Sequence, residues 1–399
     1  MQMTSRRPPR FPRCAPARRI APLALVAVAA SCSAADSLDP SDTWTGFDQP
    51  VVYDARATGL IRLSARHILG DQRLDLIMVA RGDLTVKVLP GTAAGRFGTV
   101  VSLPIGSDTR DAVVGDVNGD GIADLIATGH FDNAFFVRRG LGGGEFAPQV
   151  AYALRNHGHL LVVANLNDDG FDDIVAVHHG SGQPIYATAY LGAANGAMRV
   201  AWEFGSDYFT ARGVVAGDFN DDGKTDIAIA AADNRASVLV FRGLGTGAFE
   251  APTILPSLAS DPGSSDGTVA VATADLNRDG RDDLTVARWD VANALVVRLA
   301  TPAGFSDPVL IPLPAPIDVG LGDVNGDGNV DAVAANLEHG TVSILLGKGN
   351  GTFAPAMTVT IGTQPAWLTV ADFDDDGLAD VAVADQDDHK IRVLRSRRG

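Results

Sequence analysis

The residues with the clearest chemical potential are aspartates and asparagines that recur in the pattern Asp-x-Asn/Asp-x-Asp-Gly-x-x-Asp. The copy that begins at Asp116 runs through Asn118, Asp120 and Gly121 to Asp124. Positions one, three and five place side-chain oxygens inside a tight turn, and glycine at position six permits the sharp bend. Position seven offers a backbone carbonyl, so its side chain is free to vary. Oxygen ligands without histidine or cysteine favour Ca²⁺ over Zn²⁺ or copper.

Five further loops repeat this pattern in the same frame, so we expect about six structural Ca²⁺ ions. They begin at Asn165, Asp218, Asp275, Asp323 and Asp372. The predicted ligands, at positions one, three, five, seven and nine of each loop, are Asp116, Asn118, Asp120, Ile122, Asp124, Asn165, Asn167, Asp169, Phe171, Asp173, Asp218, Asn220, Asp222, Lys224, Asp226, Asp275, Asn277, Asp279, Arg281, Asp283, Asp323, Asn325, Asp327, Asn329, Asp331, Asp372, Asp374, Asp376, Leu378 and Asp380.

The six loops differ in the number of carboxylates that they offer. The loop at Asn165 has two among its ligands, Asp169 and Asp173, and is expected to bind most weakly. The loop at Asp372 has four and is expected to bind best. An alternative interpretation is that these are turns without a metal, because Asp, Asn and Gly favour turns by themselves. Six copies in register favour the metal interpretation.

A seventh copy of the loop, beginning at His67, is degraded. Only Asp71 and Asp75 remain of its acids, while His67, Leu69 and Gln72 depart from the pattern. We therefore expect six occupied loops rather than seven.

The elements that position these loops are short strands in a repeat of about 49 residues. From His67 onward, successive copies are 49, 49, 53, 57, 48 and 49 residues apart. In the second copy, apolar runs at 112–115, 125–127, 134–137 and 150–152 are separated by the Asp loop, a polar turn and a Gly-rich turn. Four short strands in a unit of this size predict the blade of a β-propeller, and hence an all-β fold.

A second marker, a Phe after the Gly-rich turn, also counts to seven but is offset from the Asp loops. The markers are Phe47, Phe97, Phe146, Phe249, Phe305 and Phe353, with Met198 in the remaining place. The last unit ends after its third strand, at 390–394, and the segment 46–53 carries the missing fourth. We therefore predict a seven-bladed propeller of four-stranded antiparallel blades, in which the N-terminal segment supplies the outer strand of the last blade.

These units resemble FG-GAP repeats, also called VCBS repeats, which form the seven-bladed propeller of integrin α-subunits and occur in many exported bacterial proteins. The resemblance rests on Asp-Val-Asn-Gly-Asp-Gly-x-x-Asp together with Gly-x-Gly-x-Phe-x-x-Pro, and it covers about residues 45–396. It implies that each Asp loop joins the first two strands of a blade and holds Ca²⁺. It implies a fold and a metal but no reaction.

The N-terminus is typical of an export signal. Residues 1–19 contain six arginines, and an apolar segment follows at 20–30, too short to span a bilayer. The sequence Ala-Ala-Ser-Cys at 29–32 resembles a bacterial lipobox, so we expect a signal peptide at 1–31, lipidation of Cys32 and a tether at 32–44 before the propeller at 45–399. The alternatives are cleavage after residues 33–35 and a twin-arginine signal. The chain is therefore expected to be secreted, periplasmic or a cell-surface lipoprotein.

Composition excludes some partners. The net charge is −16, and without the first 31 residues 26 basic residues face 48 acidic ones, which leaves −22. Phosphate would repel such a chain, so nucleic acid is an improbable partner, and a membrane would be reached only through the lipid at Cys32. Both cysteines, Cys14 and Cys32, precede the repeats, so disulfides do not hold the fold.

No esterase elbow, phosphate loop or zinc-protease motif occurs. We therefore expect a monomeric, non-catalytic binding or scaffold module for a protein or glycan ligand. The alternative is a polysaccharide-acting, lyase-like enzyme on the face formed by the turns between strands two and three. Its residues would come from a cluster of Arg155, His157, His159, His178 and His179. Trp289 and Trp367 would either stack on sugars or pack in the fold.

Overall fold

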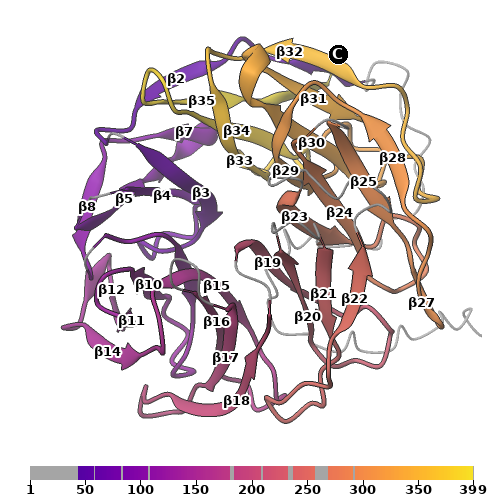
Figure 1. Cartoon of the computed structure of the whole chain (residues 1–399). Helices are drawn as coiled ribbons and strands as arrows, with labels where there is room; N and C mark the ends of the chain where they lie inside the picture. The colour runs from indigo at the N-terminus through magenta and orange to yellow at the C-terminus, as the bar shows by residue number, and fades with distance from the viewer. Residues whose placement is uncertain are drawn as a thin grey trace, which may run out of the picture.

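The structure is a ring of seven small sheets (Figure 1). The computed structural model describes residues 44–57, 59–81, 84–106, 108–179, 184–207, 210–231, 237–256, 268–290 and 293–398. Each sheet has four antiparallel strands, and in six of the seven the strands follow one another outward from the axis in sequence order. The predicted all-β, seven-bladed propeller is confirmed.

The first three blades have the following strands. Blade 1 contains β3 (Leu60–Arg66), β4 (Asp75–Ala80), β5 (Thr85–Leu89) and β8 (Val101–Pro104). Blade 2 contains β9 (Ala112–Gly115), β10 (Asp124–Gly129), β11 (Ala134–Arg138) and β14 (Val150–Ala153). Blade 3 contains β15 (Gly158–Ala164), β16 (Asp173–His178), β17 (Tyr186–Leu191) and β18 (Arg199–Gly205).

The next three blades follow the same plan. Blade 4 contains β19 (Ala211–Gly217), β20 (Asp226–Ala231), β21 (Ser237–Phe241) and β22 (Thr253–Pro256). Blade 5 contains β23 (Thr268–Ala274), β24 (Asp283–Arg288), β25 (Ala294–Arg298) and β28 (Val309–Pro312). Blade 6 contains β29 (Pro316–Gly322), β30 (Asp331–Asn336), β31 (Thr341–Leu345) and β32 (Met357–Thr360).

The chain ends meet in blade 7. It contains β33 (Pro365–Ala371), β34 (Asp380–Asp385) and β35 (Lys390–Leu394), and its outer strand is β2 (Val51–Asp54). Val51 lies opposite Val393, and Asp54 lies opposite Lys390. The predicted closure of the ring by the N-terminal segment is therefore confirmed.

Short two-stranded ribbons join strands three and four in several blades. They are β6 (Gly91–Thr92) with β7 (Arg96–Phe97), β12 (Gly140–Gly142) with β13 (Glu145–Phe146), and β26 (Ala300–Thr301) with β27 (Gly304–Phe305). In blade 7 the corresponding ribbon pairs β1 (Trp44–Phe47) with β36 (Ser396–Arg398). Helical structure in the described ranges is confined to two 3₁₀ turns, η2 (Ala93–Gly95) and η3 (Leu337–His339). Among these residues no helix has the length and apolar character that a membrane span needs.

The core is a circle of seven apolar clusters, each between two neighbouring blades. The second strand of every blade is buried along its whole length, because a neighbouring blade covers each of its faces. The Phe markers belong to these interfaces: Phe97 packs between blades 7 and 1, and Phe249 between blades 3 and 4. Met198 takes the same place between blades 2 and 3. The marker is therefore a contact between blades, and an unbranched apolar side chain can replace the ring.

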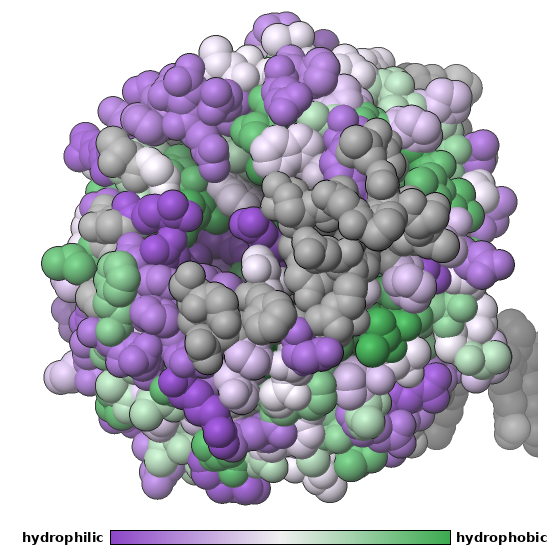
Figure 2. Space-filling view, in the orientation of Figure 1, coloured by the Kyte–Doolittle hydropathy of each residue, from purple (hydrophilic) through white to green (hydrophobic). Residues whose placement is uncertain are grey.

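One arginine near the axis contacts residues of several blades. Arg62 of β3 lies with its Nε 3.7 Å from Asp111 of blade 2, and it donates to the carbonyl of Arg212 in blade 4 at 3.1 Å. Its guanidinium carbon lies 5.0 Å from the ring centroid of Trp367 in blade 7. On the face seen in Figure 2, hydrophilic residues edge a recess near the axis.

Candidate functional site

The six Asp loops occupy equivalent places, since each connects strands one and two of a blade. The loop at Asp116, for example, links β9 to β10. Because neighbouring strands are antiparallel, all of these loops and the ribbons between strands three and four lie at one end of the ring. The turns between strands two and three lie at the other end.

Position one organises the loop backbone. The carboxylate of Asp116 accepts N–H bonds from Gly119 at 2.7 Å, Asp120 at 3.1 Å and Gly121 at 2.8 Å. Gly121 has φ +79°, a conformation that an L side chain would strain. The same carboxylate-to-backbone bonds recur in the loops that begin at Asp218, Asp275, Asp323 and Asp372. The N–H groups at this turn preorganise a concave set of oxygens.

Positions three and five face each other across the turn. In the loop at Asp116, the Asn118 amide donates to Asp120 at 2.9 Å, and the Ile122 N–H donates to the other oxygen of Asp120 at 2.9 Å. The amide-to-carboxylate contact is present in all five loops that have Asn at position three. These loops thus bring together the predicted oxygens of positions one, three and five.

At positions one, three and five, the loop of blade 7 has three carboxylates, whereas four of the other intact loops have two and an amide, and the loop at Asn165 has one and two amides. Oxygens of Asp372, Asp374 and Asp376 lie within 4.8 Å of one another. Asp374 Oδ1 is buried without a hydrogen-bond partner, although Asp374 Oδ2 accepts from Arg395 at 3.1 Å. Burial and the adjacent carboxylates raise the pKa of Asp374. An orphaned oxygen among converging carboxylates fits a hard divalent cation.

Position nine differs from positions one, three and five, because its aspartate is fully buried and bonds to the connection between strands three and four as well as to its own loop. Asp124 accepts the N–H of Val117 at 3.0 Å and that of Gly140, at the start of the ribbon, at 2.8 Å. A Cβ at Gly140 would lie 2.3 Å from the Ala123 carbonyl, so only glycine allows this approach. The same pair of bonds is made by the position-nine aspartate of every blade.

Burial raises the pKa of the position-nine carboxyls, and nearby loop carboxylates add to this effect. The pKa rises to about 6 for Asp124 and Asp173, to about 7 for Asp226, Asp283 and Asp331, and to about 8 for Asp380. The structural role of position nine was not foreseen from the sequence. The sequence feature that could have indicated this role is Asp75, which keeps position nine in the first copy although most of the other predicted ligands of that copy are lost.

That first loop contains its own cation. Arg73, at position seven, contacts Asp71 at 3.1 Å. Asp75 nevertheless accepts the N–H groups of Ile68, at 3.1 Å, and Gly91, at 2.8 Å, as in the other blades. Blade 1 therefore keeps the two backbone hydrogen bonds to the position-nine aspartate but lacks the side-chain oxygens of positions one and three.

Loops of neighbouring blades are joined in pairs. The Asp172 N–H donates to the Asp116 carbonyl at 2.9 Å, and the Asp116 N–H donates to the Asp172 side chain at 2.8 Å. Asp282 and Asp218 repeat both bonds, at 2.9 Å and 3.0 Å. Ordering one loop therefore restrains the backbone of the next.

At the other end of the ring, the structure divides the predicted His/Arg cluster. His157, His159 and His179 are brought together and are joined by His130 of blade 2. Ring centroids are 4.4 Å apart for His130–His157, 4.8 Å for His130–His159 and 3.7 Å for His159–His179. Burial and the neighbouring histidines lower the pKa of His159 to about 2.

The other members of the predicted cluster have separate partners. His178 is fully buried, its Nε2 lies 3.1 Å from the Thr188 hydroxyl, and burial lowers its pKa to about 4. Arg155 forms an exposed ion pair with Glu203 at 3.1 Å. Both tryptophans pack at blade interfaces: Trp289 borders the core between blades 5 and 6, and the Trp367 indole donates to the Leu60 carbonyl at 3.1 Å.

Seven four-stranded blades with Asp-rich loops at one end define the class of repeat β-propellers. The sequence profile of the FG-GAP-like repeat matches residues 68–127, 165–229, 218–286 and 323–383, which is more than half of the chain. The chain belongs to the family of FG-GAP-like repeat proteins. No curated protein sequence matches it significantly.

Solved structures support the same fold. The crystal structure of BBS1N in complex with ARL6DN, soaked with lead, superimposes with a TM-score of 0.61 at 12% identity, and the match covers 90% of this chain and 98% of that chain. The same complex soaked with mercury gives a TM-score of 0.61 at 12% identity, over 88% and 97% of the two chains. Identity this low establishes a common architecture alone.

Proposed function

We propose that the protein is an exported, calcium-stabilised β-propeller that acts as a non-catalytic binding module for a protein or glycan ligand at the cell surface. The observation that carries the metal part is the group of Asp372, Asp374 and Asp376, with its orphaned carboxylate oxygen. Five further loops present the related set of two carboxylates and an amide, or, at Asn165, one carboxylate and two amides.

The ion would be held by the side chains of positions one, three and five and by the position-seven carbonyl, with position nine behind them. Bound Ca²⁺ supplies positive charge to carboxylates that otherwise repel one another. Six ions would change a net charge of −22 to −10. The paired bonds between loops, such as Asp116 with Asp172, would extend this stabilisation from one blade to its neighbour.

Export and anchoring are supported by sequence features outside the described residues. The arginines of 1–19, the apolar segment and the lipobox-like sequence before Cys32 precede the propeller. Trp44, where the described chain begins, lies at the closing blade. A lipid at Cys32 would thus hold a monomeric propeller to a membrane through a short tether.

A binding role is favoured over catalysis by the state of the histidines. An effective general base has a pKa near the working pH. The pKa values of His159, about 2, and His178, about 4, make both weak bases. Incubation with neutral and anionic polysaccharides should therefore yield no unsaturated products. Turnover that His157→Ala abolishes would instead establish the lyase-like enzyme.

The metal proposal is tested by melting the protein with Ca²⁺ and with chelator. At a tenfold excess over Kd each site adds about 1.4 kcal/mol, so six sites add about 8 kcal/mol. Asp376→Ala should reduce the calcium-dependent rise in Tm. Asp71→Ala alters position five of the degraded loop and serves as the matched control. A Tm that Ca²⁺ does not change, or an equal loss in both variants, would refute the proposal.

A further inference from the structure

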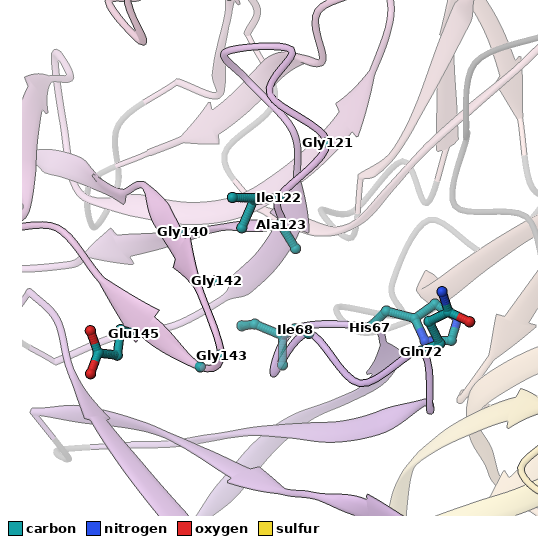
Figure 3. A pocket seen from close by; sticks show the side chains of 12 residues that line it. His67, Ile68, Gln72, Gly121, Ile122, Ala123, Gly140, Gly142, Gly143 and Glu145 are labelled. Atoms are coloured by element: carbon teal, nitrogen blue, oxygen red, sulfur yellow. The ribbon is translucent and has the colours of Figure 1, made fainter.

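A cleft of about 600 Å³ opens between blades 1 and 2, at the end of the ring that carries the Asp loops (Figure 3). One wall is the degraded loop of blade 1, with His67, Ile68 and Gln72. The other consists of Ile122 from the loop of blade 2 and Glu145 from the ribbon β12–β13. Its volume lies within the range of about 300–1,000 Å³ that is usual for ligand pockets.

The cleft lies where the position-seven side chain of blade 2 does not pack against the preceding loop, since no Ile122 atom lies within 4 Å of a Cβ built at Gly70. Between blades 2 and 3, the ring of Phe171 lies against Gly119 of the preceding loop, 2.7 Å from where a Cβ would stand. Between blades 6 and 7, Leu378 lies equally close to Gly326. At the corresponding Gly70 of blade 1, the nearest atoms belong to Gly143 of the ribbon. Ile122 therefore leaves open a space that its counterparts fill.

The lining disfavours an anionic ligand and offers both polar and apolar surface. Among the described residues that line the cleft there is no lysine or arginine, and Glu145 is the one acidic residue. An anion would meet no cationic partner and would face the carboxylates of the adjacent loops. Ile122 offers aliphatic surface, whereas Ile68 is buried in the core behind it, and imidazole, amide and carboxylate groups offer hydrogen bonds.

Five of the six glycines that line the cleft add at least partly exposed backbone, whereas Gly140 is buried and donates its N–H to Asp124. Three of them, Gly142, Gly143 and Gly144, have φ of +85°, +62° and +77°, so the ribbon turn keeps this shape without side chains. Backbone N–H and C=O groups that side chains do not cover can bind hydroxyl groups directly. In Figure 3 the ribbon turn and the His67 loop face each other across the cleft.

We infer that this cleft binds an uncharged saccharide, with a C–H face against Ile122 and hydroxyl groups on His67, Gln72, Glu145 and the glycine backbone. This inference rests on the proposed role of the protein as a binding module and assigns that role a place and a ligand class. It also implies that the wall formed by Ile122 depends on an ordered loop in blade 2.

The test is binding to an array of neutral and uronate-containing oligosaccharides in saturating Ca²⁺, followed by calorimetry with the strongest neutral binder. Ile122→Phe copies the residue that closes the next interface, and it should weaken binding at least tenfold. Leu244→Phe places the same ring at an exposed position of the connection between β21 and β22 in blade 4, outside every Asp loop, and should leave binding unchanged. Equal melting temperatures would show that both variants are folded.

Polar contacts are tested by Glu145→Gln, which should weaken binding about tenfold, with the exposed Glu250→Gln of blade 4 as control. Neutral binding that Ile122→Phe leaves intact would overturn the assignment to this cleft but leave the binding-module proposal standing. Binding only to uronates, or to no saccharide, would overturn the inference itself. A peptide-array signal lost in Ile122→Phe would assign the cleft to a protein ligand instead.

Discussion

At the axis of the ring, a single guanidinium opposes the charge of two buried carboxyls. Burial raises the pKa of Asp111 and Asp318, while Arg62 acts in the opposite direction on both. Each carboxylate also accepts an N–H from the next blade, Leu161 and Leu368 respectively, at 2.9 Å. Arg62 therefore offsets part of the burial effect on the pKa of two groups that tie blades together.

Replacing Arg62 by methionine should lower the free energy of unfolding by about 1–3 kcal/mol, because two desolvated carboxylates lose their counter-charge. Denaturant unfolding in saturating Ca²⁺ measures the change. Arg212→Met is the control, since Arg212 is exposed and contacts Arg62 through its backbone carbonyl. Similar losses in the two variants would contradict a special role for Arg62.

The pKa of Asp318, raised to about 6 mainly by burial, predicts a pH dependence of stability. The folded state holds this proton more tightly than the unfolded chain, whose ordinary pKa is 3.8. The stability that it contributes is thus complete below pH 3.8 and is lost as the pH rises through about 6. In Asp318→Asn the loss of unfolding free energy between pH 5 and pH 7.5 should be smaller by about 1 kcal/mol. Denaturant unfolding at the two pH values checks this, and parallel pH profiles for variant and parent would rule it out.

At the scale of the elements, the connection between strands one and two has two separate structural roles, and the sequence motif does not distinguish them. Positions one, three and five form an oxygen-lined turn, whereas position nine bonds that turn to the following ribbon. Blade 1 retains the second role, through Asp75, without the first. The blade needs the backbone bonds whether or not an ion is present.

Asp75→Asn should therefore destabilise the protein by about 1–3 kcal/mol, because one buried N–H loses its acceptor. The loss should be the same with Ca²⁺ and with chelator, as judged by denaturant unfolding in each condition. Asp120→Asn alters position five of an intact loop, and its effect should depend on Ca²⁺. A calcium-dependent loss in Asp75→Asn would mean that the first loop binds metal after all.

The periodic features of these elements could be predicted from the sequence. The Asp pattern and the offset Phe markers located the blades and the shared closing blade, because each reports a contact made once per repeat. Features that depend on unlike residues meeting in space could not be predicted. Examples are the reach of Arg62 to Arg212, the contact of His130 with His157, and the cleft left by Ile122.

At the scale of the whole molecule, stability is distributed around a circle. The apolar cluster between blades 7 and 1 is of the same kind as the other six. Every blade therefore packs against a neighbour on both sides. The closing blade is the exception in connectivity, because β2 and β35 come from opposite ends of the chain. Removing residues from the N-terminal end of the chain can therefore weaken the closure of the whole ring.

Removing residues 1–54 should leave the edge of β35 unpaired and lower the Tm or cause aggregation, whereas removing 1–43 should not. Thermal melting and light scattering of the two truncated proteins provide the comparison. If both melted alike, the outer strand of blade 7 would contribute nothing to ring stability.

The same closing blade determines when folding can finish. Thr45 donates to the carbonyl of Arg397, a residue 352 positions later in the chain. A ribosome makes the N-terminal strands first, and they wait without a partner until nearly the last residue has emerged. The intermediate blades form local hairpins and can assemble in order, but completion of the circle is a late, long-range step. The cell must therefore protect an unfinished ring until β35 and β36 have been made.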